Sequence, residues 1–491
     1  MAGKGTADAL SHSIDHYSTA TEMRAALRSK AVSARELAEL HIARIEAKDG
    51  ELNAIPVRTF QRARAAADAA DAAIARGDEA PLLGVPMTLK ESTLTAGLPQ
   101  SAGIPDFAKH VPTVDGPLAK AVFAAGACLL GKTNIPVALG DWQADSPVYG
   151  RTNNPWDPSR TPGGSTGGGG AALAAGMTPL EVGSDIGGSI RVPAAYCGVF
   201  GHRPSETAIP RTGAFPLADV PNPMAILGVQ GPLARSAADL ELLFDVLVGP
   251  EAGEDVAWRL QLPPPRHTKL GDFRVAVLPE TSVSVPPSSA MHGALAETVA
   301  LLRSEGASVD EAGPDVDWTA YLHDYYRLLM AMISLGQPRE EREANAASLR
   351  ASGDPAMAAQ ADGMTMDFAE MMQVCARRER VRMAWRDFFE DRDLVLAPMT
   401  LDAAFEHQTG AFAERTITID NRTVPYGANL LQPMIAIFPG LPSTAFPAGL
   451  DPRGLPLGLQ AIGPYLEDRT PLRFAQLLEA AGHAFRAPPG Y

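Results

Sequence analysis

The stretch that decides the fold runs from residue 162 to residue 193 and reads PGGSTGGGGAALAAGMTPLEVGSDIGGSIRVP. Six of the eight positions from Gly163 to Gly170 are glycine. Glycine is entropically costly to order, but it admits backbone conformations closed to other residues and lets a chain or ligand approach closely. A folded protein that keeps such a run therefore uses it. Two serines, Ser165 and Ser189, stand beside glycine pairs in this glycine-rich loop.

The surroundings of Ser189 suit a nucleophile. A serine hydroxyl is weak until a base removes its proton, and the developing oxyanion needs donors already aimed at it. Ile186, Gly187 and Gly188 can supply backbone N–H groups beside Ser189, because the glycines place no side chain in the way. The pattern outlines an oxyanion hole, although an isolated G-G-S tripeptide is more typical of a simple turn between a strand and a helix.

Length and composition point to a globular enzyme. The 491 residues allow about three domains or one large α/β unit, and 46% hydrophobic with 20% charged residues is ordinary for a folded chain. A net charge of -15 would repel nucleic acids and anionic membranes, so we expect neither as a partner. With no secretory signal and no run of about 20 apolar residues, we expect a cytoplasmic protein.

The sequence offers no metal or disulfide framework. Cys128, Cys197 and Cys375 are odd in number and widely spaced, so reduced thiols are expected. Among the histidines only His12 and His16 stand four apart, in a polar segment near the amino terminus. We therefore expect no metal and no organic cofactor.

Hydrophobic periodicity predicts alternating helices and strands. Helices are expected at 33–48, 61–76, 118–125, 236–248 and 470–482, with mostly helical structure from about 290 to 390. Short apolar runs predict strands at 85–89, 128–130, 180–182, 273–278, 394–397 and 457–462. Strands that alternate with helices indicate an α/β sheet covered on both faces.

In this context the residues resemble the amidase signature family. The matching pattern runs from Gly163 to Pro193 and continues in blocks along nearly the whole chain: Gly84, Pro86 and Lys90; Gly131 to Asn134; Asn154 to Trp156; and Gly454 to Gly463. The resemblance implies one large domain over 1–491 with a central mixed, twisted sheet. Within it we expect a helical segment (1–80), a signature core (81–250), a variable, mostly helical region (251–390) and a second core part (391–491).

The resemblance also implies a catalytic triad of serine, cis-serine and lysine. Ser189 takes the place of the nucleophile, Ser165 that of the bridging serine on a cis peptide bond, and Lys90 that of the base. A lysine is a base only when neutral, and burial lowers its pKa toward that state. Of eight lysines only Lys90 and Lys132 end apolar strand-like runs; the resemblance selects Lys90 and leaves Lys132 a structural role.

Several positions depart from the family pattern. Thr166 replaces a second serine, Ser184 a threonine and Glu91 an aspartate, and each keeps the hydroxyl or carboxylate. Gly169 and Gly170 lengthen the glycine run, which we expect to loosen the loop.

Two other motifs are met by spacing alone. Gly126 to Thr133 fits the phosphate-binding pattern G-x-x-x-x-G-K-T, but an apolar strand-like run fills its centre, where the mechanism requires a loop. Gly163, Ser165 and Gly167 fit the G-x-S-x-G elbow of α/β-hydrolases, which would make the chain an esterase with His407 or His483 as its base. Cys197 could suggest a thiol nucleophile, but a lone cysteine among small residues is typical of a core.

The sequence therefore predicts a hydrolase acting through an acyl-enzyme on an amide-type carbon–nitrogen bond, with carbamates and esters compatible with the same chemistry. Candidate substrate-binding residues are Trp142, Tyr149 and Phe438, with Phe405, Tyr426 and Ile437 as further aromatic or apolar candidates. An alternative is the amidase subunit of a glutamine-dependent tRNA amidotransferase, which acts with partner chains. A homodimer is also compatible with the sequence.

Overall fold

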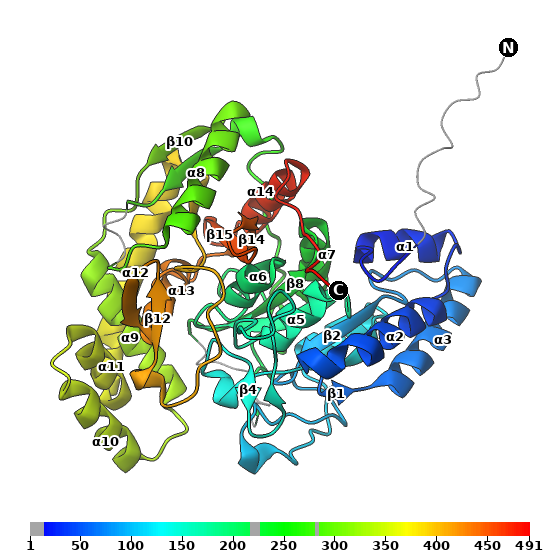
Figure 1. Cartoon of the computed structure of the whole chain (residues 1–491), viewed down its shortest axis with the longest axis horizontal. Coiled ribbons are helices and arrows are strands. Elements are labelled where there is room, and N and C mark those ends of the chain that lie inside the picture. Colours follow the sequence, from blue (N-terminus) through cyan, green and yellow to red (C-terminus); the bar gives the residue numbers. More distant parts are fainter. Residues whose placement is uncertain (1–13, 217–225, 280–283) are drawn as a thin grey trace.

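A mixed sheet of 11 strands forms the centre of the computed structural model, which describes residues 14–216, 226–279 and 284–491 (Figure 1). In spatial order the strands are β1 (Val57–Arg58), β3 (Cys128–Thr133), β2 (Pro86–Lys90), β6 (Leu180–Asp185), β8 (Val229–Ala234), β7 (Phe200–Arg203), β14 (Ser443–Leu450), β15 (Pro456–Ile462), β11 (Leu394–Pro398), β9 (Arg274–Val277) and β10 (Ser308–Glu311). Strand β2 pairs in parallel with β3 and β6, whereas β7, β8, β14 and β15 pair antiparallel. The predicted α/β fold with a mixed sheet is confirmed.

Helices cover the sheet and extend beyond its two ends. They are α1 (Ala20–Arg28), α2 (Ala34–Leu52), α3 (Phe60–Arg76), α4 (Pro117–Ala124), α5 (Gly167–Ala174), α6 (Arg191–Cys197), α7 (Ala237–Leu247), α8 (Ser289–Ser304), α9 (Trp318–Ile333), α10 (Arg339–Arg350), α11 (Pro355–Thr365), α12 (Phe368–Asp391), α13 (Met434–Ile437) and α14 (Arg469–Ala480). Helices α1 to α3 lie at one end of the molecule and α9 to α12 at the other (Figure 1).

The capping signals in the sequence account for several helix starts. Ser33 and Glu36 form the predicted capping box at the start of α2. At α7 only half of the predicted box forms, because Ser236 accepts from the Asp239 N–H while the Asp239 carboxylate instead accepts from backbone N–H groups of α1. The Asp239 carboxylate therefore links the start of α1 to the start of α7.

The alternation of side chains along β2 and β6 separates two faces of the sheet. Leu89 and Val182 belong to the large apolar core that also contains residues of α4, α7 and α14. Their neighbours Lys90 and Glu181 therefore point to the opposite face, where α5 packs. Thr88, the pairing partner of Glu181, shares this second face.

The glycine run is helical rather than a loop. Gly167 to Gly170 form the first turn of α5, so the expectation of a loosened loop is wrong for these residues. A Cβ on Gly168 would lie 2.3 Å from the Asn134 nitrogen and 2.6 Å from the Ala54 oxygen. Helix α5 can press directly on the neighbouring backbone because these positions carry no side chain.

The six predicted strands are present, but β1, β7, β8, β10 and β14 were not predicted. β9 and β10 join one edge of the sheet, so the region 251–390 contributes strands as well as helices α8 to α12. Two hairpins lie outside the main sheet: β4 (Asp145–Ser146) with β5 (Gly150–Arg151), and β12 (Thr416–Ile419) with β13 (Arg422–Pro425). The subdivision of the chain into four segments stays a prediction, and its first 13 residues, His12 included, lie outside the described residues.

The helices that the structure describes include none with the length and apolar character needed to cross a membrane. Over the same three ranges, no group of three or more His, Cys, Asp or Glu side chains is arranged to hold a metal ion.

Candidate active site

Lys90 and Ser165 meet in the interior of the protein. Lys90 is the last residue of β2, and Ser165 lies two residues before α5. The Lys90 Nζ is 2.7 Å from the Ser165 Oγ and 2.9 Å from the Ser184 Oγ on β6. The peptide bond between Gly164 and Ser165 is cis, as the resemblance implied.

The environment of Lys90 favours the neutral amine. Its side chain is buried at the sheet, and this burial lowers the pKa of Lys90 to about 7, against the opposing charges of Asp185 and Glu181. Near neutral pH a substantial fraction of Lys90 is therefore unprotonated, which is the state a general base requires.

Ser189 lies between the end of β6 and the start of α6, and 6% of its surface is exposed. The Thr166 N–H donates to the Ser189 carbonyl over 3.2 Å, which ties the segment of Ser165 to that of Ser189. Among the described residues, the Ser189 hydroxyl has no hydrogen-bond partner. Lys90 and Ser165 are thus in direct contact, and the backbone bond from Thr166 places the segment of Ser189 next to that of Ser165.

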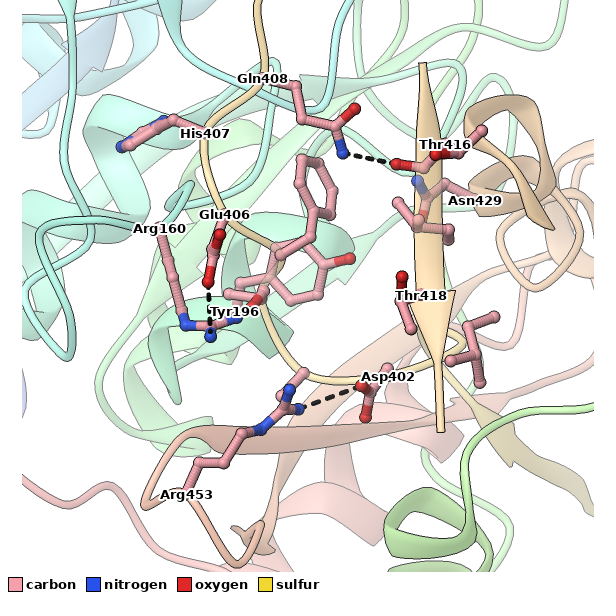
Figure 2. A pocket seen from close by; sticks show the side chains of 15 residues that line it. Arg160, Tyr196, Asp402, Glu406, His407, Gln408, Thr416, Thr418, Asn429 and Arg453 are labelled. Carbon is pink, nitrogen blue, oxygen red and sulfur yellow. Dashed lines mark hydrogen bonds and ion pairs between the residues drawn. The ribbon is translucent and has the colours of Figure 1, made fainter. Parts of the chain in front are cut away.

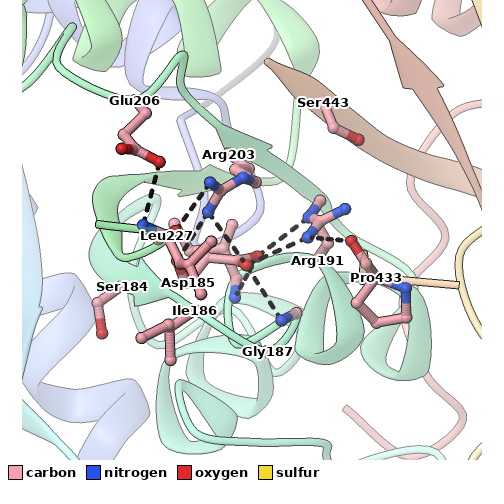
Figure 3. Close-up of polar contacts among 12 residues, drawn as sticks. Ser184, Asp185, Ile186, Gly187, Arg191, Arg203, Glu206, Leu227, Pro433 and Ser443 are labelled. Carbon is pink, nitrogen blue, oxygen red and sulfur yellow. Dashed lines mark hydrogen bonds and ion pairs between the residues drawn. The ribbon is translucent and has the colours of Figure 1, made fainter. Parts of the chain in front are cut away.

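A buried ion network holds the turn before Ser189 (Figure 3). The Asp185 carboxylate accepts from the Gly188 N–H at 3.0 Å and from the Arg191 Nε at 3.0 Å. Arg203 donates to the Asp185 carbonyl at 2.8 Å. Burial alone would raise the pKa of Asp185, but the charges of Arg191 and Arg203 hold it at about 2. Asp185 therefore stays ionised and fixes the turn.

More distant parts of the chain orient the same turn. The Trp142 Nε1 donates to the Gly187 carbonyl at 3.0 Å, and the Tyr325 hydroxyl of α9 donates to the Ile186 carbonyl at 3.1 Å. Arg191 also donates to the Gln460 Oε1 of β15 at 2.7 Å. Of the three predicted oxyanion donors, the Gly188 N–H already donates to the Asp185 carboxylate. The Ile186 and Gly187 carbonyls accept hydrogen bonds from the side chains of Tyr325 and Trp142, which hold these two peptide groups in place.

Sequence reasoning named Asp185 and Arg191 only as parts of the pattern and missed Arg203 and Tyr325. Charged residues inside a glycine-rich, apolar stretch were the available signal for the first two. Arg203 gave no signal, because its partner lies on another strand.

The predicted substrate-binding residues have three different placements. Trp142 lies beside the turn, with its ring centroid 5.4 Å from that of Tyr426. The Tyr149 hydroxyl donates to the Glu91 Oε1 at 2.7 Å, at the edge of the segment that follows Lys90. Phe438 is fully buried, with its ring centroid 4.8 Å from that of Tyr321. This core placement does not favour a contact between Phe438 and substrate.

A polar cavity of about 320 Å³ lies near the β12–β13 hairpin (Figure 2). Its lining includes Tyr196, at the far end of α6 from Ser189, together with two ion pairs, Arg160 with Glu406 and Arg453 with Asp402. Phe405 also lines it and contacts Tyr426. The cavity contains none of Lys90, Ser165 and Ser189, so it is separate from the site they form.

The competing motifs do not form the sites they would require. Lys132 lies within β3, buried, and donates to the Pro99 carbonyl, so no phosphate-binding loop exists there. No strand leads into Ser165, as the hydrolase elbow would need, and His483 is engaged with the Pro447 carbonyl at 3.0 Å. Burial raises the pKa of the Cys197 thiol, which disfavours its thiolate as a nucleophile.

Comparison with known proteins agrees with this architecture. A family model described as Amidase matches residues 36–472. Indoleacetamide hydrolase of Bradyrhizobium diazoefficiens is 33% identical over 462 residues, covering 92% of this chain and 84% of the relative. A glutamyl-tRNA(Gln) amidotransferase subunit of Synechococcus sp. (strain WH7803) is 31% identical over 501 residues, covering 95% and 98%. A solved structure, described as a vestigial complex that reveals the origins of an s-triazine catabolic enzyme, matches with a TM-score of 0.79 at 29% identity, covering 96% and 100%. The chain belongs to the amidase family, that of the amidase signature enzymes.

Proposed function

We propose that this chain hydrolyses an amide-type carbon–nitrogen bond of a small molecule, with Ser189 as nucleophile, Ser165 as the bridging serine and Lys90 as base. The observation that carries the proposal is the buried 2.7 Å contact between the Lys90 Nζ and the Ser165 Oγ, beside a free Ser189 hydroxyl. A lysine whose pKa is lowered to about 7 can accept a proton near neutral pH.

The proton path follows from the order of these groups. Neutral Lys90 takes a proton from Ser165, which takes one from Ser189 as that oxygen attacks the carbonyl carbon. The oxyanion forms next to the backbone N–H groups of Ile186 and Gly187; the Gly188 N–H, shared with Asp185, is the weakest of the three predicted donors. The relay then protonates the leaving amine, and water attacks the acyl-enzyme by the same route in reverse.

Rigid support of the turn is what makes this oxyanion hole effective. Donors stabilise a developing charge best when they need no reorganisation during the reaction. Asp185, Trp142 and Tyr325 hold the turn from three directions. No metal or organic cofactor enters the proposed cycle.

The substrate class rests on the residues around the turn. Trp142 and Tyr426 place aromatic surface beside Gly187, which suits an aryl or alkyl acyl group. Carbamates, including urethanes, and esters form the same tetrahedral intermediate and belong in the same panel of substrates. Tyr149 is the further proposed contact, and Phe438 is the weakest of the three.

The experiment that tests the function is covalent capture of the nucleophile. Ser189→Ala should abolish labelling by a fluorophosphonate and all turnover of primary amides, anilides, carbamates and esters, because Ser189 is the proposed site of the acyl-enzyme. Wild-type protein, labelled and digested, should carry the adduct on the peptide that contains Ser189. A Ser189→Ala variant that is still labelled, or that still turns over substrate, contradicts the proposal.

A second candidate is the amidase subunit of a glutamine-dependent tRNA amidotransferase, favoured by 31% identity over 95% of this chain to one such protein. The two functions separate on the purified chain. Turnover of simple amides without partners supports the hydrolase, whereas glutaminase activity that appears only with copurifying chains supports the amidotransferase role. The mass of the purified protein in solution tests the proposed homodimer in the same preparation.

A further inference from the structure

Glu181 is a buried carboxyl group that the proposed cycle does not use. It is the second residue of β6 and is fully inaccessible to solvent. A carboxylate without a charged partner is among the costliest groups to bury. Its position in a fully buried strand therefore calls for an explanation.

Strand pairing places the Glu181 side chain on the same face as Lys90. In the parallel pairing of β2 and β6, Glu181 is opposite Thr88, two residues before Lys90. In the pairing of β2 and β3, Lys90 is opposite Thr133. Residues two apart on a strand, and paired residues of parallel strands, point to the same side.

The hydrogen bond of Glu181 crosses over β2. The Thr133 Oγ1 on β3 donates to the Glu181 Oε1 on β6 over 2.7 Å, and β2 lies between these two strands. The carboxyl group of Glu181 consequently reaches across the strand that carries Lys90, on the same face of the sheet and away from solvent.

The second carboxyl oxygen, Oε2, has no hydrogen-bond partner in the part of the chain that the structure describes. Close packing holds the Glu181 side chain, because a Cβ on Gly169 of α5 would lie 2.6 Å from the Glu181 Cγ and 2.9 Å from its Oε1. Helix α5 contributes glycine, alanine and leucine here and no titratable group. Besides the hydroxyls of Thr133 and Thr88, the carboxyl group interacts with the charge of Lys90.

Lys90 and Glu181 affect each other's charge. Burial raises the pKa of Glu181, against the hydroxyls of Thr88 and Thr133 and the charge of Lys90. Among the described residues, Asp185 also raises the pKa of Lys90, and its effect is larger than that of Glu181; Asp185 is itself paired with Arg191 and Arg203. Lys132 on β3 shares the face of Leu89, its partner in the pairing with β2, and so points away.

We propose that Glu181 is a positioning residue for Lys90, and that its carboxyl group sets how readily the lysine holds the proton it receives from Ser165. An ionised Glu181 stabilises the ammonium form of Lys90, and a neutral Glu181 does not, so Lys90 then loses its proton at a lower pH. The two groups therefore titrate as a pair. This inference rests on the proposed function for its catalytic meaning, but the coupling itself is a property of the folded protein.

The direct test is to titrate Lys90 in the full-length protein by NMR of 13Cε-labelled lysine. The chain has eight lysines, so the signal of Lys90 can be assigned from its loss in Lys90→Met. In Glu181→Gln, which keeps the shape and the acceptor for Thr133, we expect Lys90 to titrate in a single step with a midpoint lower by about half a unit or more. Lys132, which is also buried, is the internal control, and its titration midpoint should not change.

The double variant Gly169→Ala with Glu181→Ala serves if Glu181→Gln does not fold. The new Cβ at 169 occupies space that the shortened side chain vacates, so packing is restored without the carboxyl group. The same downward shift of the Lys90 midpoint is expected. A Lys90 titration identical to wild type in either folded variant overturns the proposal.

Kinetics add a measurement, the pH dependence of the capture rate, that would not change if Glu181 only filled space in the core. The acid limb of the rate of fluorophosphonate capture against pH should shift downward in Glu181→Gln, in parallel with the NMR midpoint, and the plateau should fall because the lysine is a weaker base. Failure of Ser189 labelling in wild type would contradict the proposed function and leave the NMR result to decide the coupling. An NMR shift without any change in the pH profile would overturn the catalytic meaning of Glu181.

Discussion

Lys90 and Lys132 lie at the same end of two adjacent strands and are both buried, yet their partners differ. Lys132 donates to the carbonyl of Pro99, whereas Lys90 meets the hydroxyls of Ser165 and Ser184. Burial lowers the pKa of both, to about 8 for Lys132 and about 7 for Lys90. A carbonyl has no proton to give, so Lys132 can only anchor a loop. A hydroxyl can give one, so Lys90 can act as a base.

The largest effect should come from removing each amine in turn. Lys90→Met should lower kcat/KM by about a thousandfold or more, because the proton relay ends at Lys90. Lys132→Met should keep kcat within about tenfold but lower the free energy of unfolding by about 1 to 3 kcal/mol, because the Pro99 carbonyl loses its donor. Steady-state kinetics and urea unfolding on both variants make the measurement.

Circular dichroism of Lys90→Met is the control: a spectrum like that of wild type shows that the activity is lost because the amine is missing and not because the protein is unfolded. If Lys132→Met lost activity as completely as Lys90→Met while remaining folded, the contrast between base and anchor would be wrong.

Stability against pH should distinguish Lys90 from an ordinary surface lysine. Its pKa falls from 10.5 when unfolded to about 7 when folded, so between these values the unfolded chain binds more protons and stability rises with pH. Lys90→Met lacks this dependence, so its stability relative to wild type should be about 4 kcal/mol greater at pH 6 than at pH 10. Urea unfolding at pH 6, 8 and 10 measures it; a constant difference at all three would show that the folded protein does not shift the pKa of Lys90.

The smallest effect concerns the second contact of Lys90. Ser184→Ala removes the hydroxyl 2.9 Å from the Lys90 Nζ and should lower kcat by about threefold to tenfold with little change in KM, as expected for one lost hydrogen bond. Ser184→Thr keeps a hydroxyl and should behave like wild type. A thousandfold loss in Ser184→Ala would place Ser184, rather than Ser165, in the proton path.

The sequence indicated Ser189 through its local glycines and the family pattern, and Ser165 and Lys90 mainly through the family pattern; the structure shows Lys90 in contact with Ser165, and the catalytic roles of the three stay proposals. The sequence could not separate Lys90 from Lys132 by physics alone, since both end apolar runs; the face of the sheet decides, and that depends on register between strands. The same limit explains Glu181, which was included in the apolar run Leu180 to Val182 although a charged residue there was a signal of a buried partner.

The general α/β fold could be predicted from the sequence, but three strands in the middle of the sheet could not. Strands β8 and β14 carry glycine and proline and β7 carries a glycine, residues that locally disfavour strands, and sheet pairing overrides this preference. Aromatic residues were the least reliable indicators of the substrate-binding site, because Trp142 at the turn and Phe438 in the core have the same apolar character in the sequence.

The bond between Arg191 and Gln460 joins residues 269 positions apart, and β15, which carries Gln460, lies between β14 and β11 within the sheet. Arg191 also holds Asp185, so the turn before Ser189 receives its full support only when the last strand is in place. During synthesis on the ribosome, most of the chain must therefore emerge before the nucleophile is correctly held. A nascent chain that is cut short before residue 460 would carry Lys90, Ser165 and Ser189 without the framework that aligns them.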